Sequence, residues 1–194
     1  IRVGANSGGG GGSNMSYWDS IYVYEMLWKD LSGNGNNGAV NNTVYQSGSI
    51  EHFDFDGTDD YVDIGNSFQT TFNGSFTISH WVKLDDGNPS PEIYVFGTEN
   101  FSNEDWVSLK VGVTGKFNFY YKSNTNSLTA VTSSAVFSDG PTAWTHVALV
   151  APGTGTDLLI YINGKSVAHT GGNIPDMSTW ESSDNVFIGA TNDA

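Results

Sequence analysis

The feature that most restricts the fold of this chain is a two-residue alternation of apolar and polar side chains. In the stretch SFTISHWVKL, Phe76, Ile78 and Val82 fall on one side of an extended strand, and Thr77 and Ser79 fall on the other. Successive side chains of a β-strand point to opposite faces, so this period indicates strands that are buried on one side. The first side also carries His80 and Leu84, and the second also carries Trp81 and Lys83.

The same alternation, or a denser apolar run, recurs along most of the chain. Asn163-Gly164 separates two such segments, and both residues tolerate the positive φ angles of a type I′ turn, which predicts a hairpin. No segment sustains the 3.6-residue period of a helix, and one helical turn is predicted near Asp176–Trp180. Further strands are predicted at Ile21–Trp28, His52–Phe55, Asp60–Ile64, Glu92–Phe96, Trp106–Val111, Lys116–Lys122, Leu128–Thr132, Trp144–Val150, Asp157–Ile162, Lys165–His169 and Asn185–Ile188.

Many short strands joined by Gly-, Asn-, Asp- and Ser-rich turns predict an all-β fold, a two-sheet antiparallel β-sandwich. A propeller would need an internal repeat of about 40–50 residues, and the sequence contains none. A chain of 194 residues suits one domain. We expect residues 1–16, which include GGGGGS, to form a flexible tether and residues 17–194 to form the sandwich.

Charge and composition exclude several classes of partner. The chain has 7 Lys and Arg against 21 Asp and Glu, a net charge of -14. Such a surface repels phosphate backbones and anionic headgroups, so neither nucleic acid nor membrane is an expected partner. There is no cysteine, which excludes disulfides and Cys-ligated metals. Cations, glycans and basic protein surfaces remain open.

Six motifs follow one another in order: LWKDLSGNGNNGAV, GSIEHFDFDGTDDYVDIGN, GSFTISHWVKL, WTHVALV, LLIYINGKSVA and NVFIGA. They extend from about Trp28 to Ala190. Together they resemble the laminin-G-like, or concanavalin A-like, domains of bacterial and phage surface proteins. The resemblance implies a jelly roll of two curved sheets whose rim loops often bind sugar or calcium.

The resemblance also carries expectations about context. The pair DLSGNGNNG and FDGTDDYV is most similar to domains in virion proteins of tailed phages, which implies an extracellular or virion-surface location and other virion proteins as partners. In this family FIGA is usually followed by a closing strand that pairs with the first strand. The sequence stops at Ala194, so we expect that strand to lie beyond it or to be replaced by a neighbouring chain, as in a homo-oligomer.

Catalytic patterns are weak in this sequence. Hydrolases of this fold carry carboxylates on one strand in an E-x-D-x(x)-E pattern, with the catalytic pair ~5–5.5 Å apart when they retain configuration. In EHFDFD, Glu51 faces one way and Asp54 and Asp56 the other, so the protein is predicted not to be an enzyme. His80 and His146 are interpreted as hydrogen-bonded sheet histidines, and His52 and His169 lack metal-ligand spacing.

Two loops carry oxygen ligands of the kind that Ca²⁺ prefers. In the first, Asp30, Asn34 and Asn36 could contribute to a structural calcium site, and Asp59 and Asp60 could do so in the second. The first loop is not an EF-hand, because it lacks the bidentate glutamate at position twelve. The alternative for both loops is a tight turn held by Asx hydrogen bonds.

Sugar sites stack a ring on Trp or Tyr and fix hydroxyl groups with polar side chains. Trp106 and Trp180 are candidates because turn-like residues flank them, and Tyr94 and Tyr120 because they lie on predicted strands. Trp81 and Trp144 are predicted to be core residues.

Three functions compete at this point. The first is a non-catalytic adhesion or carbohydrate-binding module that contacts host or environmental glycans from a phage virion. The second is a structural decoration or docking domain without a glycan ligand, and the third is a glycoside hydrolase.

Overall fold

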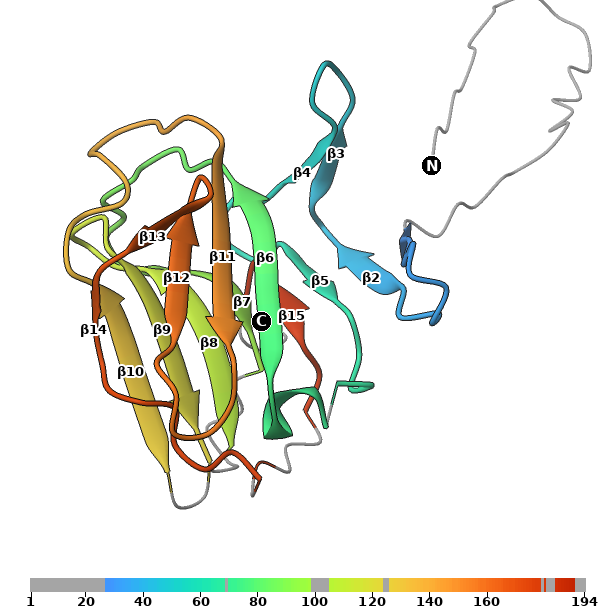
Figure 1. The fold of residues 1–194 in the computed structure, drawn as a ribbon. Helices are drawn as coiled ribbons and strands as arrows, with labels where there is room; N and C mark the ends of the chain where they lie inside the picture. The colour runs from blue at the N-terminus through green and yellow to red at the C-terminus, as the bar shows by residue number, and fades with distance from the viewer. Residues whose placement is uncertain are drawn as a thin grey trace, which may run out of the picture.

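The computed structural model describes residues 27–68, 70–98, 105–123, 126–178, 180 and 184–190. In these residues the chain forms two large antiparallel sheets that lie face to face, with β6, β11, β12 and β13 in front of β7–β10 in Figure 1. The larger sheet has the order β1 (Leu27–Trp28), β2 (Gly38–Asn41), β5 (Tyr61–Asp63), β15 (Phe187–Ile188), β7 (Ile93–Gly97), β8 (Trp106–Val111), β9 (Phe117–Lys122), β10 (Ser127–Thr132) and β14 (His169–Thr170). The smaller sheet has the order β13 (Lys165–Val167), β12 (Leu159–Ile162), β11 (Thr145–Ala151) and β6 (Phe76–Val82).

A third, two-stranded sheet stands apart from the sandwich. It pairs β3 (Val44–Gln46) with β4 (His52–Asp54), and its hairpin projects beyond the end of the two large sheets (Figure 1). Phe53 of this hairpin stacks on Trp28, with ring centroids 5.0 Å apart. The hairpin is therefore tied to the first strand of the large sheet by aromatic contact.

The predicted β-sandwich is confirmed, and so is the hairpin at Asn163-Gly164. These two residues connect β12 to β13 with φ angles of 50° and 77°. Gly38 shows why a glycine ends the GNGNNG stretch: a Cβ at this position would collide with the side chain of Val62 on the neighbouring strand β5. The glycine permits this close approach of β2 and β5.

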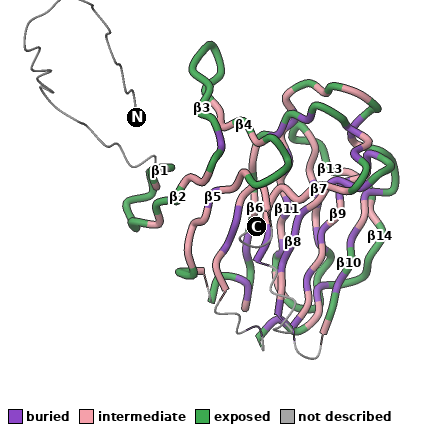
Figure 2. The backbone as a smooth tube through the Cα atoms, turned by 180° about the vertical axis from the view of Figure 1, so that it is seen from behind, coloured by how far each residue is buried: buried purple, intermediate pink, exposed green. Residues whose placement is uncertain are grey.

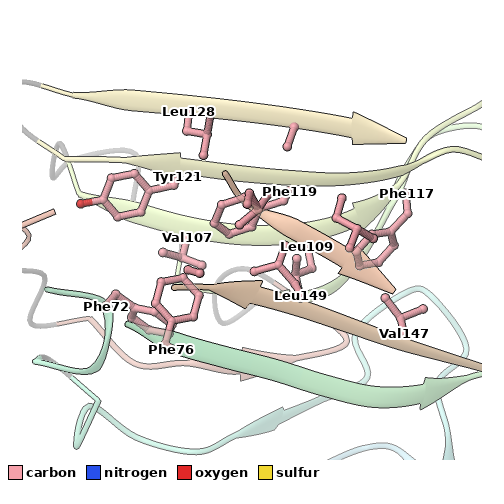
Figure 3. Packing of buried hydrophobic residues seen from close by; sticks show 14 of the residues in the cluster. Phe72, Phe76, Val107, Leu109, Phe117, Phe119, Tyr121, Leu128, Val147 and Leu149 are labelled. Carbon is pink, nitrogen blue, oxygen red and sulfur yellow. The ribbon is translucent and has the colours of Figure 1, made fainter. Parts of the chain in front are cut away.

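The core lies between the two large sheets. Residues of β9 alternate strictly, with Phe117, Phe119 and Tyr121 buried and the residues between them half-buried. The buried side chains meet Val147 and Leu149 of β11 across the sandwich, as Figure 3 shows. Each fully buried side chain of this size contributes about 1.5–3 kcal/mol of hydrophobic free energy. Figure 2 shows buried residues along β8, β9 and β10, separated in β9 by half-buried residues and in β10 mostly by exposed ones.

The structure corrects several predictions. Trp81 is 63% exposed, because the alternation of β6 turns it away from the core, so its assignment to the core was wrong. Trp144 is half-buried and packs edge-to-face on His52. The described residues of Asp176–Trp180 form a turn, closed by a hydrogen bond from the Trp180 amide to the Met177 carbonyl, instead of a helical turn. The described chain has one short 3₁₀ helix, η1 (Thr71–Asn73), which the sequence did not predict.

Strand boundaries moved as well. β2 and β3 are short strands that were not predicted, and the predicted strand Lys165–His169 is divided between β13 and the start of β14. Of the predicted strand Ile21–Trp28, only Leu27–Trp28 falls within the described residues. The predicted tether at residues 1–16 also lies outside them.

Candidate functional site

The outer face of the large sheet brings together three of the four aromatic candidates. Strand pairing places Trp106 opposite Lys122, and Tyr94 opposite Lys110. Tyr120 lies on the same face, because it alternates with the buried Phe119 and Tyr121. All five side chains are half-buried. We call this set, Tyr94, Trp106, Lys110, Tyr120 and Lys122, the aromatic–lysine face.

The rings and charges of this face are in direct contact. The centroids of Trp106 and Tyr120 lie 5.2 Å apart in an edge-to-face arrangement. The Lys122 ammonium lies 5.6 Å from the centroid of the Trp106 ring, and the Lys110 ammonium lies 5.6 Å from that of Tyr94. Both distances fall within the range of cation–π attraction, which holds the charged groups beside the rings.

Glu92 completes the polar part of the face. Its carboxylate accepts a hydrogen bond of 2.7 Å from Lys110 Nζ. Ser108 is opposite Tyr120 in the ladder, and Asn118 is opposite Lys110. Ser108 is buried, so the face offers aromatic rings with charged and amide groups, which is the chemistry of a site for polar ligands with flat apolar patches.

Trp180, the fourth aromatic candidate, lies in the interior. It is 1% exposed and packs edge-to-face on Phe72, with ring centroids 5.1 Å apart. A buried ring offers no surface to a sugar, so Trp180 is a core residue in this structure. Trp180 and Trp106 both have polar residues beside them in the sequence, and only the fold distinguishes the two.

In the DLSGNGNNG loop, hydrogen bonds within the loop hold the carboxylate of Asp30. One oxygen accepts from the Ser32 amide at 2.7 Å and the other from the Asn36 amide at 2.9 Å. Asn37 Oδ1 accepts from the Asp30 amide in return. These bonds, with those to Ser32 first, lower the pKa of Asp30 below its ordinary value. The loop thus has the hydrogen bonds expected of an Asx-type turn.

The second loop gathers three acidic residues. Carboxylate oxygens of Asp56, Asp59 and Asp60 lie within 4.8 Å of one another. Asp59 also accepts a hydrogen bond from the side-chain amide of Asn42, and Asp60 accepts one from the Asp56 amide. Three hard oxygen donors at this separation fit the chemistry of a calcium ion. This cluster contains both predicted metal residues of the second loop.

A shallow groove of about 500 Å³ lies beside the first loop. Trp28, Ile64, Phe68 and Ile188 supply apolar surface to its lining. Asp30, Asn34 and Asn36, the predicted metal residues of the first loop, also line it. Sequence analysis did not predict that Trp28 lines a groove. Its motif, LWKDLSGNGNNGAV, was used only as evidence of the family resemblance.

The histidines divide into two groups. His146 makes the predicted hydrogen bond, with its Nε2 2.9 Å from Ser79 Oγ. His169 and His52, for which no hydrogen bond was predicted, also make one: His169 Nε2 lies 2.7 Å from the Leu158 carbonyl, and His52 Nδ1 lies 3.0 Å from the Ile50 carbonyl. His80 differs from the prediction, because its Nε2 is buried and has no hydrogen-bond partner among the described residues. Burial, and secondly the proximity of His146, lower the pKa of His80 to about 4.

Comparison with known proteins agrees with the fold. The family model described as the concanavalin A-like lectin/glucanases superfamily matches residues 56–194, and the chain belongs to this family. No curated protein matches the chain. In the described residues, no helix is long and apolar enough to span a membrane.

Several solved structures are similar. The binding domain of botulinum neurotoxin serotype D/C VPI 5993 has a TM-score of 0.59 and 19% identity, and the match covers 82% of this chain and 39% of that domain. An S-layer domain-containing protein from Clostridium thermocellum has a TM-score of 0.48 and 26% identity, covering 78% of this chain and 68% of that one. The CBM40 of Ruminococcus gnavus IT-sialidase has a TM-score of 0.45 and 16% identity, covering 61% and 64%. The chain spans about two fifths of the toxin domain, and the likeness to it shows the fold alone.

Proposed function

We propose that this domain is a non-catalytic carbohydrate-binding module that acts outside the cell. The observation that carries the proposal is the aromatic–lysine face, where Trp106 and Tyr120 form a rigid pair with charged and amide groups around it. Sugar rings present flat C–H patches to aromatic side chains and hydroxyl groups to polar ones. This face offers both on a sheet, which holds them in fixed positions.

The carboxylates near this face and on the hairpin support binding rather than hydrolysis. Glu92 is engaged in the ion pair with Lys110. Glu51 belongs to EHFDFD, the segment that comes closest to the hydrolase pattern. Its carboxylate accepts a hydrogen bond from the Tyr45 hydroxyl, and this contact raises the pKa of that hydroxyl.

The binding experiment uses two matched tryptophan variants. Trp106 lies on the aromatic–lysine face, and Trp81 is an exposed tryptophan on the outer face of the other sheet. We expect the protein to bind glycans on an array and in polysaccharide pull-downs, and Trp106→Ala to lose at least tenfold in affinity while Trp81→Ala binds normally. Failure of the wild-type chain to bind any glycan, or equal loss in both variants, would overturn the proposal.

A structural calcium ion at Asp56, Asp59 and Asp60 is a further part of the proposal. An ion that binds only the folded chain raises stability by RT ln(1 + [L]/Kd), or about 2.7 kcal/mol at a hundredfold excess over Kd. We expect millimolar Ca²⁺ to raise the melting temperature, and Asp59→Asn to remove most of that increase. Asp30→Asn, in the other loop, is the matched control that should retain it.

A structural docking role is the second candidate, and one observation favours it. In the described chain, β6 is the edge strand of the smaller sheet, and its seven residues pair on one side only, with β11. Such an edge can accept a strand from a neighbouring chain. This role predicts a concentration-dependent oligomer in size-exclusion chromatography with light scattering, whereas the binding module acts as a monomer. Display on a phage virion, in either role, rests on the sequence resemblance.

A further inference from the structure

We propose that the aromatic–lysine face selects anionic sugars, and that Lys122 is the residue that binds the anionic group. The inference rests on the proposed function and adds the ligand class: a glycan whose sugars carry carboxylate or sulfate groups. It depends on a difference between the two lysines of the face.

Lys110 is already neutralised. Its ammonium donates to Glu92 at 2.7 Å, and the two side chains are 22% and 39% exposed. Lys110 lies on β8 and Glu92 directly precedes the neighbouring strand β7, so the sheet holds the pair close together. A ligand gains little charge attraction from a lysine whose counterion is built into the protein.

Lys122 has no such counterion among the described residues. In the part of the chain that the structure describes, no carboxylate lies within ion-pair distance of its ammonium. The residues opposite it in the two ladders are Trp106 and Ser127, neither of which is charged. The Lys122 side chain is half-buried, so its charge is less screened by water than that of a lysine extended into solvent.

The position of this charge matches a stacked sugar. Cation–π contact holds the Lys122 ammonium 5.6 Å from the Trp106 ring centroid. A sugar that stacks on Trp106 or Tyr120 therefore places its substituents beside a cation. An anionic substituent would form a charge-assisted hydrogen bond with it, which is roughly twice as strong as a neutral one.

The net charge of the whole protein bears on whether it can bind an anionic sugar. With a net charge of -14, the protein repels polyanions in general, so anion binding requires a specific cationic site. Lysine acts as a compact point charge without the planar fork of arginine. We therefore expect Lys122 to accept carboxylate or sulfate, with the surrounding groups deciding between them.

The test is calorimetric titration of the full chain with three oligosaccharide probes. The first is oligogalacturonate, the second is the same oligomer with its carboxyl groups reduced to alcohols, and the third is a sulfated galactan oligomer. We expect at least one anionic probe to bind about tenfold more tightly than the reduced one, because a charge-assisted bond replaces a neutral one. The preference should shrink as NaCl is raised from 50 to 300 mM.

Two lysine variants assign the effect. Lys122→Gln keeps a polar side chain, removes the charge, and should abolish the preference for the anionic probe. Lys165→Gln removes an exposed lysine of β13, on the other sheet, and should leave the preference intact. Equal melting temperatures would show that both variants fold.

The outcomes separate this inference from the proposed function. Equal binding of the reduced and anionic probes, or an anionic preference that survives Lys122→Gln, overturns the inference. If the reduced probe still binds and Trp106→Ala removes that binding, the proposed function stands without the anionic selectivity. If no probe and no array glycan binds, both fail together.

Discussion

The two faces of β8 and β9 show how one pair of strands serves two purposes. On the inner face, Val107, Leu109 and Phe119 are at most 1% exposed and form part of the core. On the outer face, their neighbours in the sequence, Trp106 and Tyr120, are half-buried and contact each other and a lysine. Successive residues of a strand alternate between faces, so a register slip of one residue would exchange the two surfaces. The requirements of the core therefore fix where the outer aromatic side chains stand.

Trp106 and Trp180 sharpen this comparison. Both are tryptophans in polar sequence surroundings, yet one lies on the outer face and the other in the interior. We expect substitutions at the interior to change stability and substitutions on the outer face to change binding.

The largest effect is expected for Trp180→Ala. Truncating a buried aromatic residue removes its transfer free energy and leaves a cavity beside Phe72, so we expect a loss of about 3–5 kcal/mol in the free energy of unfolding. Chemical denaturation measures this loss. Trp180→Phe, which fills more of the space, is the control and should lose less. If Trp180→Ala kept its stability but lost glycan binding, the assignment of stability to the interior and binding to the outer face would be wrong.

The next effect concerns His80, an interior histidine beside Phe117 and close to His146. Its pKa is lowered from 6.5 to about 4, so the unfolded chain binds this proton more readily than the folded one. The contribution of His80 to stability is full above pH 6.5 and falls as the pH drops from 6.5 towards 4, by about 2–3 kcal/mol at most.

Denaturation at pH 7 and pH 4.5 tests this dependence. The wild-type chain should lose about 2 kcal/mol more than His80→Phe between the two pH values. His52→Phe, which removes a histidine from the separate hairpin, serves as the control. An identical pH dependence in the wild-type chain and His80→Phe would mean that His80 is not a neutral interior group.

The smallest effect is expected on the outer face itself. Lys110 and Glu92 form a partly exposed ion pair, and such pairs contribute less than about 1 kcal/mol. A double-mutant cycle with Lys110→Met and Glu92→Gln should give a coupling energy below that value. A coupling above about 2 kcal/mol would show that this face, like the interior, is built for stability.

Much of the fold could be predicted from the sequence. The alternation in Phe76–Val82 and Phe117–Lys122 predicted strands that the structure contains. Asn163-Gly164 predicted the hairpin turn between β12 and β13. Local patterns failed where the three-dimensional environment decides. The alternation of β6 turned Trp81 outward with Thr77 and Ser79, although Trp81 was predicted to be a core residue.

The site could be predicted only in part. Tyr94, Trp106 and Tyr120 were identified as single aromatic residues, and strand pairing, which the sequence does not show, brought them to one face. Lys110 and Lys122 were missed, because a lysine in a strand gives no signal until its cross-strand neighbour is known. Asp56 joined Asp59 and Asp60 only once the turn was folded.

The most direct test of the account is a nuclear magnetic resonance titration that follows the tryptophan indole N–H signals. The chain has six tryptophans, and each indole gives its own signal. Assignment by single substitutions would identify those of Trp106, Trp81 and Trp180. With the glycan that binds best on the array, we predict saturable shifts at Trp106 and little change at Trp81 and Trp180. Shifts confined to Trp81, or to Trp28 beside the groove, would contradict the claim that the aromatic–lysine face binds the ligand.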